Sequence, residues 1–136
     1  MTFSIQRRTL LQSLVIGGLG TAISVPVMAQ TRARIVIVGG GFGGASAAQI
    51  LRSLLPAAMI TLVEPNATYT ACPFSNLVIG GLRDLSQQEF SYEGLKARGV
   101  EIVADRASDV DPVAQTVSLQ GGSELSYDRL ILSPGV

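Results

Sequence analysis

A glycine-rich segment that directly follows a β-branched run constrains this chain most. Residues 34–38 read Arg-Ile-Val-Ile-Val, which is typical of a short strand buried on both faces of a parallel sheet. The glycines Gly39, Gly41 and Gly44 come next with the spacing G-x-G-x-x-G, and residues 45–55 favour a helix. This order of elements predicts a βαβ unit, and therefore an α/β fold of the Rossmann type.

Each position of the glycine segment has its own physical demand. Gly39 permits a tight turn out of the strand, Gly41 lets the backbone approach a pyrophosphate, and Gly44 lets the helix pack close to the strand. Phe42 and Gly43 belong to the same loop, whose unpaired N–H groups would bind phosphates with the help of the helix dipole. We therefore expect these five residues to contact a dinucleotide.

An acidic residue stands where a dinucleotide site needs one. Residues 59–63, which follow the helix break at Pro56, predict a second strand, and Glu64 comes at its end. The Glu64 carboxylate would accept hydrogen bonds from an adenosine ribose and repel a 2′-phosphate, with Pro65 beside it in the site. The alternative, an ordinary glycine-rich turn, does not account for Glu64.

Composition excludes several kinds of chemistry. Among the 136 residues there are 10 Lys+Arg, 10 Asp+Glu, one Cys and no His. An internal disulfide, a His/Cys zinc site and a Ser-His-Asp triad are therefore impossible, and we predict no metal site. The body of the chain has no basic excess to suggest nucleic acid. Any chemistry would come from a bound cofactor.

The first 29 residues have the pattern of an export signal. Arg7 and Arg8 precede an apolar run over 10–25, and small side chains allow cleavage after Ala29. Because Thr9-Leu10-Leu11 follow the arginine pair, the signal resembles the twin-arginine type, which exports folded proteins with their cofactors. We expect a periplasmic protein with no integral membrane span after cleavage. An ordinary secretion signal and an uncleaved anchor helix are the alternatives.

The end of the chain indicates which dinucleotide binds. Residues 127–135 resemble the second FAD motif of the two-dinucleotide-binding flavoproteins, with Ser133-Pro134-Gly135 in place of Ala-Thr-Gly. Before it we expect a helix over 92–98, a strand over 100–103 and a small β-meander, whose strands lie at 107–110 and 116–119. This order favours FAD over NAD, and it adds Ala107, Ser133 and Gly135 to the cofactor-binding residues. Taken alone, residues 127–135 would be an ordinary core strand.

The only cysteine lies in a loop, predicted over 65–81, after the second strand. By composition alone, Cys72 is either a buried apolar residue or a functional thiol at the ligand crevice. The pattern Glu64-Pro65-Asn66, then Tyr69-x-x-Cys72-x-x-Ser75-Asn76-x-Val78-Ile79-Gly80-Gly81, resembles the flavoprotein subunit of flavocytochrome c sulfide dehydrogenase. The resemblance covers residues 30–136. It implies a thioether between Cys72 and the 8α-methyl of FAD, sulfide as substrate, and a c-type cytochrome subunit as electron acceptor.

The resemblance also implies that the catalytic centre lies elsewhere. In that family sulfide is oxidised at a cysteine pair, and this sequence contains neither cysteine. We therefore expect residues 30–136 to be the amino-terminal part of an FAD-binding domain that is incomplete at its C-terminus, without catalytic residues and inactive alone. The alternatives are a sulfide:quinone oxidoreductase or another pyridine-nucleotide-disulfide-type flavoprotein, and a truncated FAD-binding fragment without activity.

Overall fold

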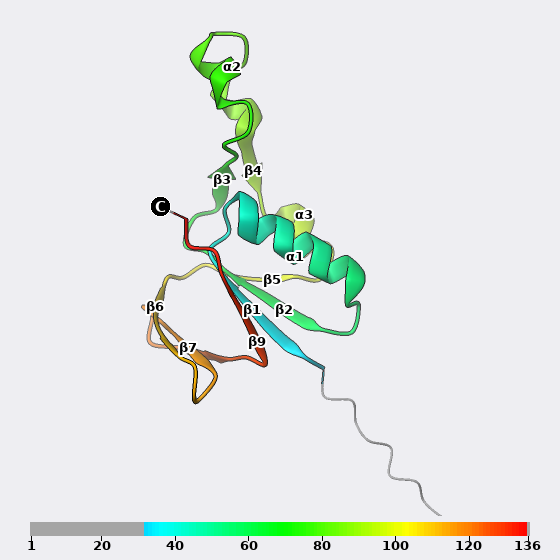
Figure 1. The fold of residues 1–136 in the computed structure, drawn as a ribbon, viewed down its shortest axis with the longest axis vertical. Coiled ribbons are helices and arrows are strands. Elements are labelled where there is room, and N and C mark those ends of the chain that lie inside the picture. The colour runs from blue at the N-terminus through cyan, green and yellow to red at the C-terminus, as the bar shows by residue number, and fades with distance from the viewer. Residues whose placement is uncertain (1–31, 136) are drawn as a thin grey trace, which may run out of the picture.

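The computed structural model describes residues 32–135, so the predicted signal at 1–29 lies outside the described residues. The centre of the fold is a four-stranded parallel sheet in the order β5-β2-β1-β9 (Figure 1). The strands have these bounds: β5 Glu101–Val103, β2 Met59–Val63, β1 Arg34–Val38 and β9 Arg129–Leu132. The predicted α/β class is confirmed, and the sheet places the end of the chain beside its first strand.

Strand β1 is covered on both faces, as its β-branched run predicts. Ile35 and Ile37 point into one apolar cluster with Ala45 and Ala48 of the helix α1 (Phe42–Leu54). Val36, between them, points to the opposite face, where it packs in a second cluster with residues of the β-meander. Successive side chains of a strand alternate between faces, so the run requires two covering layers.

Helix α1 begins three residues earlier than the sequence predicts. It starts at Phe42 and ends at Leu54, two residues before Pro56. Glycine is a poor helix former, which is why the pattern placed the start at Ala45. Gly44 is nevertheless helical and buried, because the helix here packs directly against the turn that leaves β1. Within residues 32–135 no helix is both long and apolar enough to cross a bilayer.

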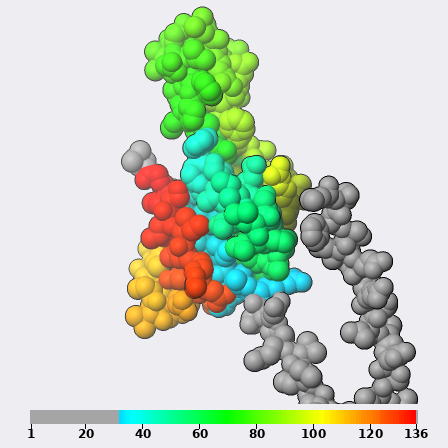
Figure 2. All heavy atoms as spheres, turned by 45° about the vertical axis from the view of Figure 1, so that its right-hand side comes forward, coloured from blue at the N-terminus to red at the C-terminus, as the bar shows by residue number. Residues whose placement is uncertain are grey.

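The segment predicted as a loop over 65–81 is partly ordered into regular structure. It contains β3 (Thr68–Thr70) and α2 (Ser75–Ile79), and is followed by the 3₁₀ helix η1 (Leu85–Gln88) and β4 (Glu89–Ser91). Strands β3 and β4 pair antiparallel, and we call residues 68–91 the arm. Figures 1 and 2 show the arm standing clear of the main sheet, with α2 far from that sheet. The sequence missed β3 because its partner lies about 20 residues away.

The elements after the arm follow the predicted order. Helix α3 (Glu93–Lys96) lies within the predicted range 92–98, and β5 comes next. The meander consists of β6 (Ala107–Asp111), β7 (Thr116–Leu119) and β8 (Glu124–Ser126). The sequence predicted the first two strands but not β8, which has only three residues and forms by pairing with β7.

Candidate functional site

The glycine turn after β1 brings the two predicted motifs together. Gly39 has φ +95°, and a Cβ on it would overlap the Ser133 carbonyl oxygen and come within 2.8 Å of the Pro134 Cα. The Ser133 amide donates to the Val38 carbonyl at 2.8 Å, and the Gly39 amide donates to the Val63 carbonyl at 2.9 Å. The carboxyl ends of β1, β2 and β9 therefore meet at one edge of the sheet, which is where open α/β sheets bind ligands.

The other glycines of the turn differ in how closely the protein packs around them. A Cβ on Gly44 would overlap the Gly39 carbonyl oxygen, and one on Gly43 would lie 2.9 Å from the Ser133 Oγ. A Cβ on Gly41, in contrast, would meet no atom within 4 Å. Helix α1 begins here without a side-chain cap and without an acid in its first turn. An uncapped helix start beside open space fits an anionic pyrophosphate. Phe42, on the first turn, is 55 % exposed.

We call residues 39–44 the cradle. Glu64 lies at its edge, where donors from the protein hold the carboxylate in place. Its Oε2 accepts a hydrogen bond from the Gly40 amide at 2.8 Å. Its Oε1 accepts from the Asn66 amide at 3.0 Å and from the Asn66 Nδ2 at 2.7 Å. A carboxylate has about four acceptor positions, so about one is left for a ribose hydroxyl. The sequence predicted Glu64 as an acceptor but neither of these two partners.

Tyr92 is a residue of the site that the sequence did not single out. It lies between β4 and α3, 52 residues from Gly40, and its hydroxyl donates to the Gly40 carbonyl at 2.8 Å. The side chain is 3 % exposed. The pKa of Tyr92 is raised to about 12, chiefly by burial, then by the negative charge of Glu64 and by the interaction with Tyr69. No local pattern could have found it, since a tyrosine before a short helix is ordinary.

Cys72 lies on the arm, between β3 and α2, and its thiol is free and exposed. The reading of Cys72 as a buried apolar residue is therefore wrong. Its carbonyl oxygen accepts from the Ser75 Oγ at 2.6 Å and from the Ser75 amide at 3.1 Å, which fixes the turn into α2. The neighbouring Ala71 amide donates to the Gln88 carbonyl at 2.8 Å.

The remaining predicted residues, Pro65, Gly135 and Ala107, lie on three different segments of the fold. Pro65 follows Glu64 and is exposed, and Gly135 has φ +82° in the turn after β9. Ala107 opens β6 and packs in the apolar cluster of Val36 and Val63, on the meander face of the sheet. Contact of these three residues with a cofactor stays a prediction.

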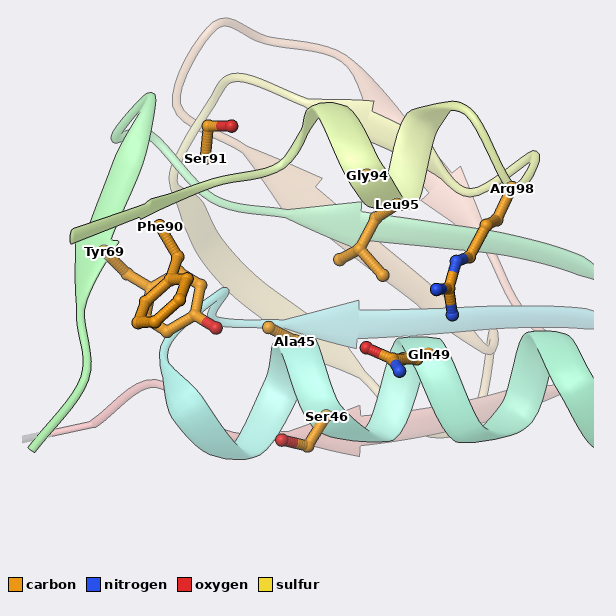
Figure 3. A pocket seen from close by; sticks show the side chains of 9 residues that line it. All are labelled: Ala45, Ser46, Gln49, Tyr69, Phe90, Ser91, Gly94, Leu95 and Arg98. Atoms are coloured by element: carbon orange, nitrogen blue, oxygen red, sulfur yellow. The ribbon is translucent and has the colours of Figure 1, made fainter. Parts of the chain in front are cut away.

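Two hollows border the arm. One, of about 190 Å³, lies between α1 and α3, and Tyr69 and Phe90 stand at one end of it (Figure 3). The other, of about 400 Å³, is bordered by Phe42 on α1 and by Phe74 and Arg83 on the arm. Gln88 also lines it, with a carboxamide that is 2 % exposed and has no hydrogen-bond partner within the described part of the chain.

Comparison with known proteins places these features in a family. Residues 33–136 match the sequence pattern of the pyridine nucleotide-disulphide oxidoreductases. The sulfide dehydrogenase (flavocytochrome c) flavoprotein chain of Chlorobaculum thiosulfatiphilum is 60 % identical over 45 residues, which cover 33 % of this chain and 94 % of that sequence. The sulfide-quinone reductase of Aquifex aeolicus is 30 % identical over 102 residues, which cover 74 % of this chain and 24 % of that protein.

The fold agrees with these relatives. The crystal structure of the sulfide:quinone oxidoreductase from Aquifex aeolicus superposes with a TM-score of 0.69 at 30 % identity, over 76 % of this chain and 24 % of that one. The chain thus spans about a quarter of the length of the sulfide:quinone oxidoreductases that it matches.

Proposed function

Because this chain belongs to the pyridine nucleotide-disulphide oxidoreductase family, we propose that it is the FAD-binding part of a sulfide dehydrogenase that passes electrons to a c-type cytochrome. The observation that carries this proposal is the 60 % identity with a flavocytochrome c sulfide dehydrogenase flavoprotein chain. FAD is the cofactor that the family and its flavoprotein members imply, and the residues of the cradle fit it.

The residues around the glycine turn would hold the ADP half of FAD. The open space at Gly41 and the uncapped start of α1 accommodate the pyrophosphate, with backbone N–H groups as donors. The remaining acceptor position of Glu64 would receive a ribose hydroxyl. When bound, FAD supplies the two-electron chemistry, taking electrons from a reduced sulfur compound and releasing them to a one-electron carrier.

We further propose that Cys72 holds the flavin covalently, through a thioether from its Sγ to the 8α carbon. Formation of this bond would break the Sγ–H bond and one C–H bond of the 8α-methyl, and the two electrons would pass to the flavin itself, leaving it reduced. Support comes from the exposure of Cys72 and from its position on the arm that follows β2, at the carboxyl edge of the sheet. Such a bond would prevent loss of the flavin outside the cytoplasm. It also fits the twin-arginine type of signal, because the flavin is then loaded before export.

Acid denaturation of the full-length holoprotein tests this link. We expect the yellow flavin to stay with the precipitated protein and to be released into the supernatant from the Cys72→Ala variant. Ser75→Ala is the matched control, since it removes a hydroxyl that bonds the Cys72 carbonyl and leaves the thiol in place. Release of all flavin from the parent protein would refute the covalent link and leave FAD binding itself unaffected.

Export to the periplasm is the second part of the proposal. It rests on Arg7 and Arg8 and on the small or modest side chains of Val27-Met28-Ala29. Replacing both arginines by lysine should keep the protein in the cytoplasm, which fractionation would show. Normal export of that double variant would contradict a twin-arginine signal.

A second candidate, a sulfide:quinone oxidoreductase, is favoured by the 30 % identity with the Aquifex aeolicus enzyme over most of the chain. The acceptor separates the two candidates. We expect the full-length protein, supplied with sulfide, to reduce a c-type cytochrome faster than a soluble quinone analogue. The reverse order would favour the second candidate, and no sulfide-dependent reduction of either would refute both.

A further inference from the structure

We propose that Tyr92 is a positioning residue of the nucleotide site, which holds the Gly40 peptide in place and ties it to the arm that carries Cys72. This inference rests on the proposed FAD-binding function and names a residue that sets the strength of that binding.

Both backbone polar groups of Gly40 are hydrogen-bonded to side chains. Its amide donates to the Glu64 Oε2 at 2.8 Å, and its carbonyl accepts from the Tyr92 hydroxyl at 2.8 Å. The fit is close, because a Cβ on Gly40 would lie 2.6 Å from the Tyr92 hydroxyl oxygen and 2.8 Å from the Glu64 Cβ. Gly40 comes directly before Gly41, the open position of the cradle. Fixing this peptide orients the loop before a ligand arrives, which lowers the entropic cost of binding.

The Tyr92 ring connects the loop to the arm. Tyr69 lies between two aromatic rings, with centroid distances of 5.7 Å to Phe90 and 5.7 Å to Tyr92. Tyr69 and Phe90 are directly opposite each other in the β3–β4 pair, and Figure 3 shows their rings overlapping. Cys72 follows β3 on the same segment. The three aromatic rings thus connect the loop at Gly40 to the strand that leads to Cys72.

The surroundings of Tyr92 keep its hydroxyl a donor. The groups that face it are Glu64, Tyr69 and the Gly40 carbonyl. Burial and the negative charge of Glu64 both disfavour the phenolate. The hydroxyl is therefore protonated at neutral pH and can donate to the Gly40 carbonyl.

The test compares two buried tyrosines in the full-length protein with the Cys72→Ala substitution, so that FAD binds reversibly. Tyr92→Phe removes the bond to Gly40. Tyr127→Phe is the matched control, because the Tyr127 hydroxyl donates to the Asp111 carbonyl at 3.4 Å, and Tyr127 packs in the meander cluster. After removal of flavin, each variant is titrated with FAD and with ADP, and its thermal unfolding is recorded.

We expect Tyr92→Phe to raise the Kd for FAD and for ADP about three- to tenfold, because the ligand must then order the backbone at Gly40 that the tyrosine otherwise holds in place. Tyr127→Phe should leave both constants unchanged. With Cys72 present, Tyr92→Phe should also lower the fraction of flavin that becomes covalent, which loss of general stability alone would not do at equal protein yield.

Two results would overturn the inference. One is an unchanged Kd for FAD and ADP in Tyr92→Phe, and the other is an equal loss of affinity in both tyrosine variants. Failure of the parent Cys72→Ala protein to bind FAD would instead refute the proposed function, and the inference with it. Normal FAD binding without sulfide oxidation would refute the proposed reaction and leave the role of Tyr92 standing.

Discussion

Replacing Glu64 by glutamine tests the nucleotide site at the residue with the most hydrogen bonds. The side chain accepts one bond from Gly40 and two from Asn66. Glutamine has the same shape, but its NH₂ group is a donor and cannot accept from an amide N–H. The substitution therefore leaves at least one protein donor unpaired and removes the charged acceptor that we assign to the ribose.

The expected size follows from the bond lost to the nucleotide. A hydrogen bond to a charged group contributes about 1.5–3 kcal/mol. At 1.4 kcal/mol for each factor of ten, the Kd for FAD should rise about ten- to 150-fold. A bond from Gly40 or from Asn66 is lost as well, so thermal unfolding of the flavin-free protein should also occur at a lower temperature.

The assay is a fluorescence titration with FAD of the full-length protein carrying Cys72→Ala. Glu101→Gln is the matched control, because the Glu101 carboxylate also accepts a hydrogen bond, from the Thr61 Oγ1 at 3.0 Å, but is not one of the proposed site residues. This control should keep the parent affinity. An unchanged Kd in Glu64→Gln would show that the carboxylate does not bind the ribose, and an equal change in both variants would show a general effect of lost charge.

Four further predictions concern the loop, the buried tyrosine and the arm. Gly41→Ala should fold with an unchanged melting temperature, because the added methyl meets no protein atom within 4 Å. It should lose FAD binding in the same titration, because the methyl takes the space that we assign to the pyrophosphate. Gly44→Ala should instead fail to accumulate as soluble protein, because the methyl overlaps the Gly39 carbonyl oxygen. The pKa of Tyr92 is raised from 10.0 to about 12, so the native state binds more protons than the unfolded state in that range and stability falls as pH rises from 10 to 12. Denaturant titrations should show a shallower fall in Tyr92→Phe, and equal slopes would contradict this. Gln88→Met should increase the free energy of unfolding by about 1–2 kcal/mol, and so raise the melting temperature, because it removes an unpaired buried carboxamide. A lower melting temperature would show that the carboxamide has a partner elsewhere in the full-length protein.

The local patterns of the sequence were enough to predict the framework of the fold. The β-branched run at 34–38, the spaced glycines and the second strand at 59–63 lie where they were expected. These features act over a few residues, since a buried strand, a tight turn and a close helix approach each restrict the side chains at the position itself. Helix α1 differs only in its start, where packing against the turn outweighs the low helix propensity of glycine.

The strands that the sequence missed each depend on a partner strand. Strand β3 exists because β4 pairs with it, and β8 because β7 does. A three-residue strand carries too little pattern to be recognised, and its stability comes from the neighbour that completes its hydrogen bonds.

For the site itself, the sequence by itself determined which residue types stand at the proposed nucleotide site: glycines for turn, space and packing, and one carboxylate after the second strand. Only the tertiary structure decided how they are held. It placed Ser133 against Gly39, Glu64 on the Gly40 amide and Tyr92 on the Gly40 carbonyl. The reason is physical: a residue's conformational limits are local, whereas the partner of a buried polar group is whichever group the fold brings within hydrogen-bond distance.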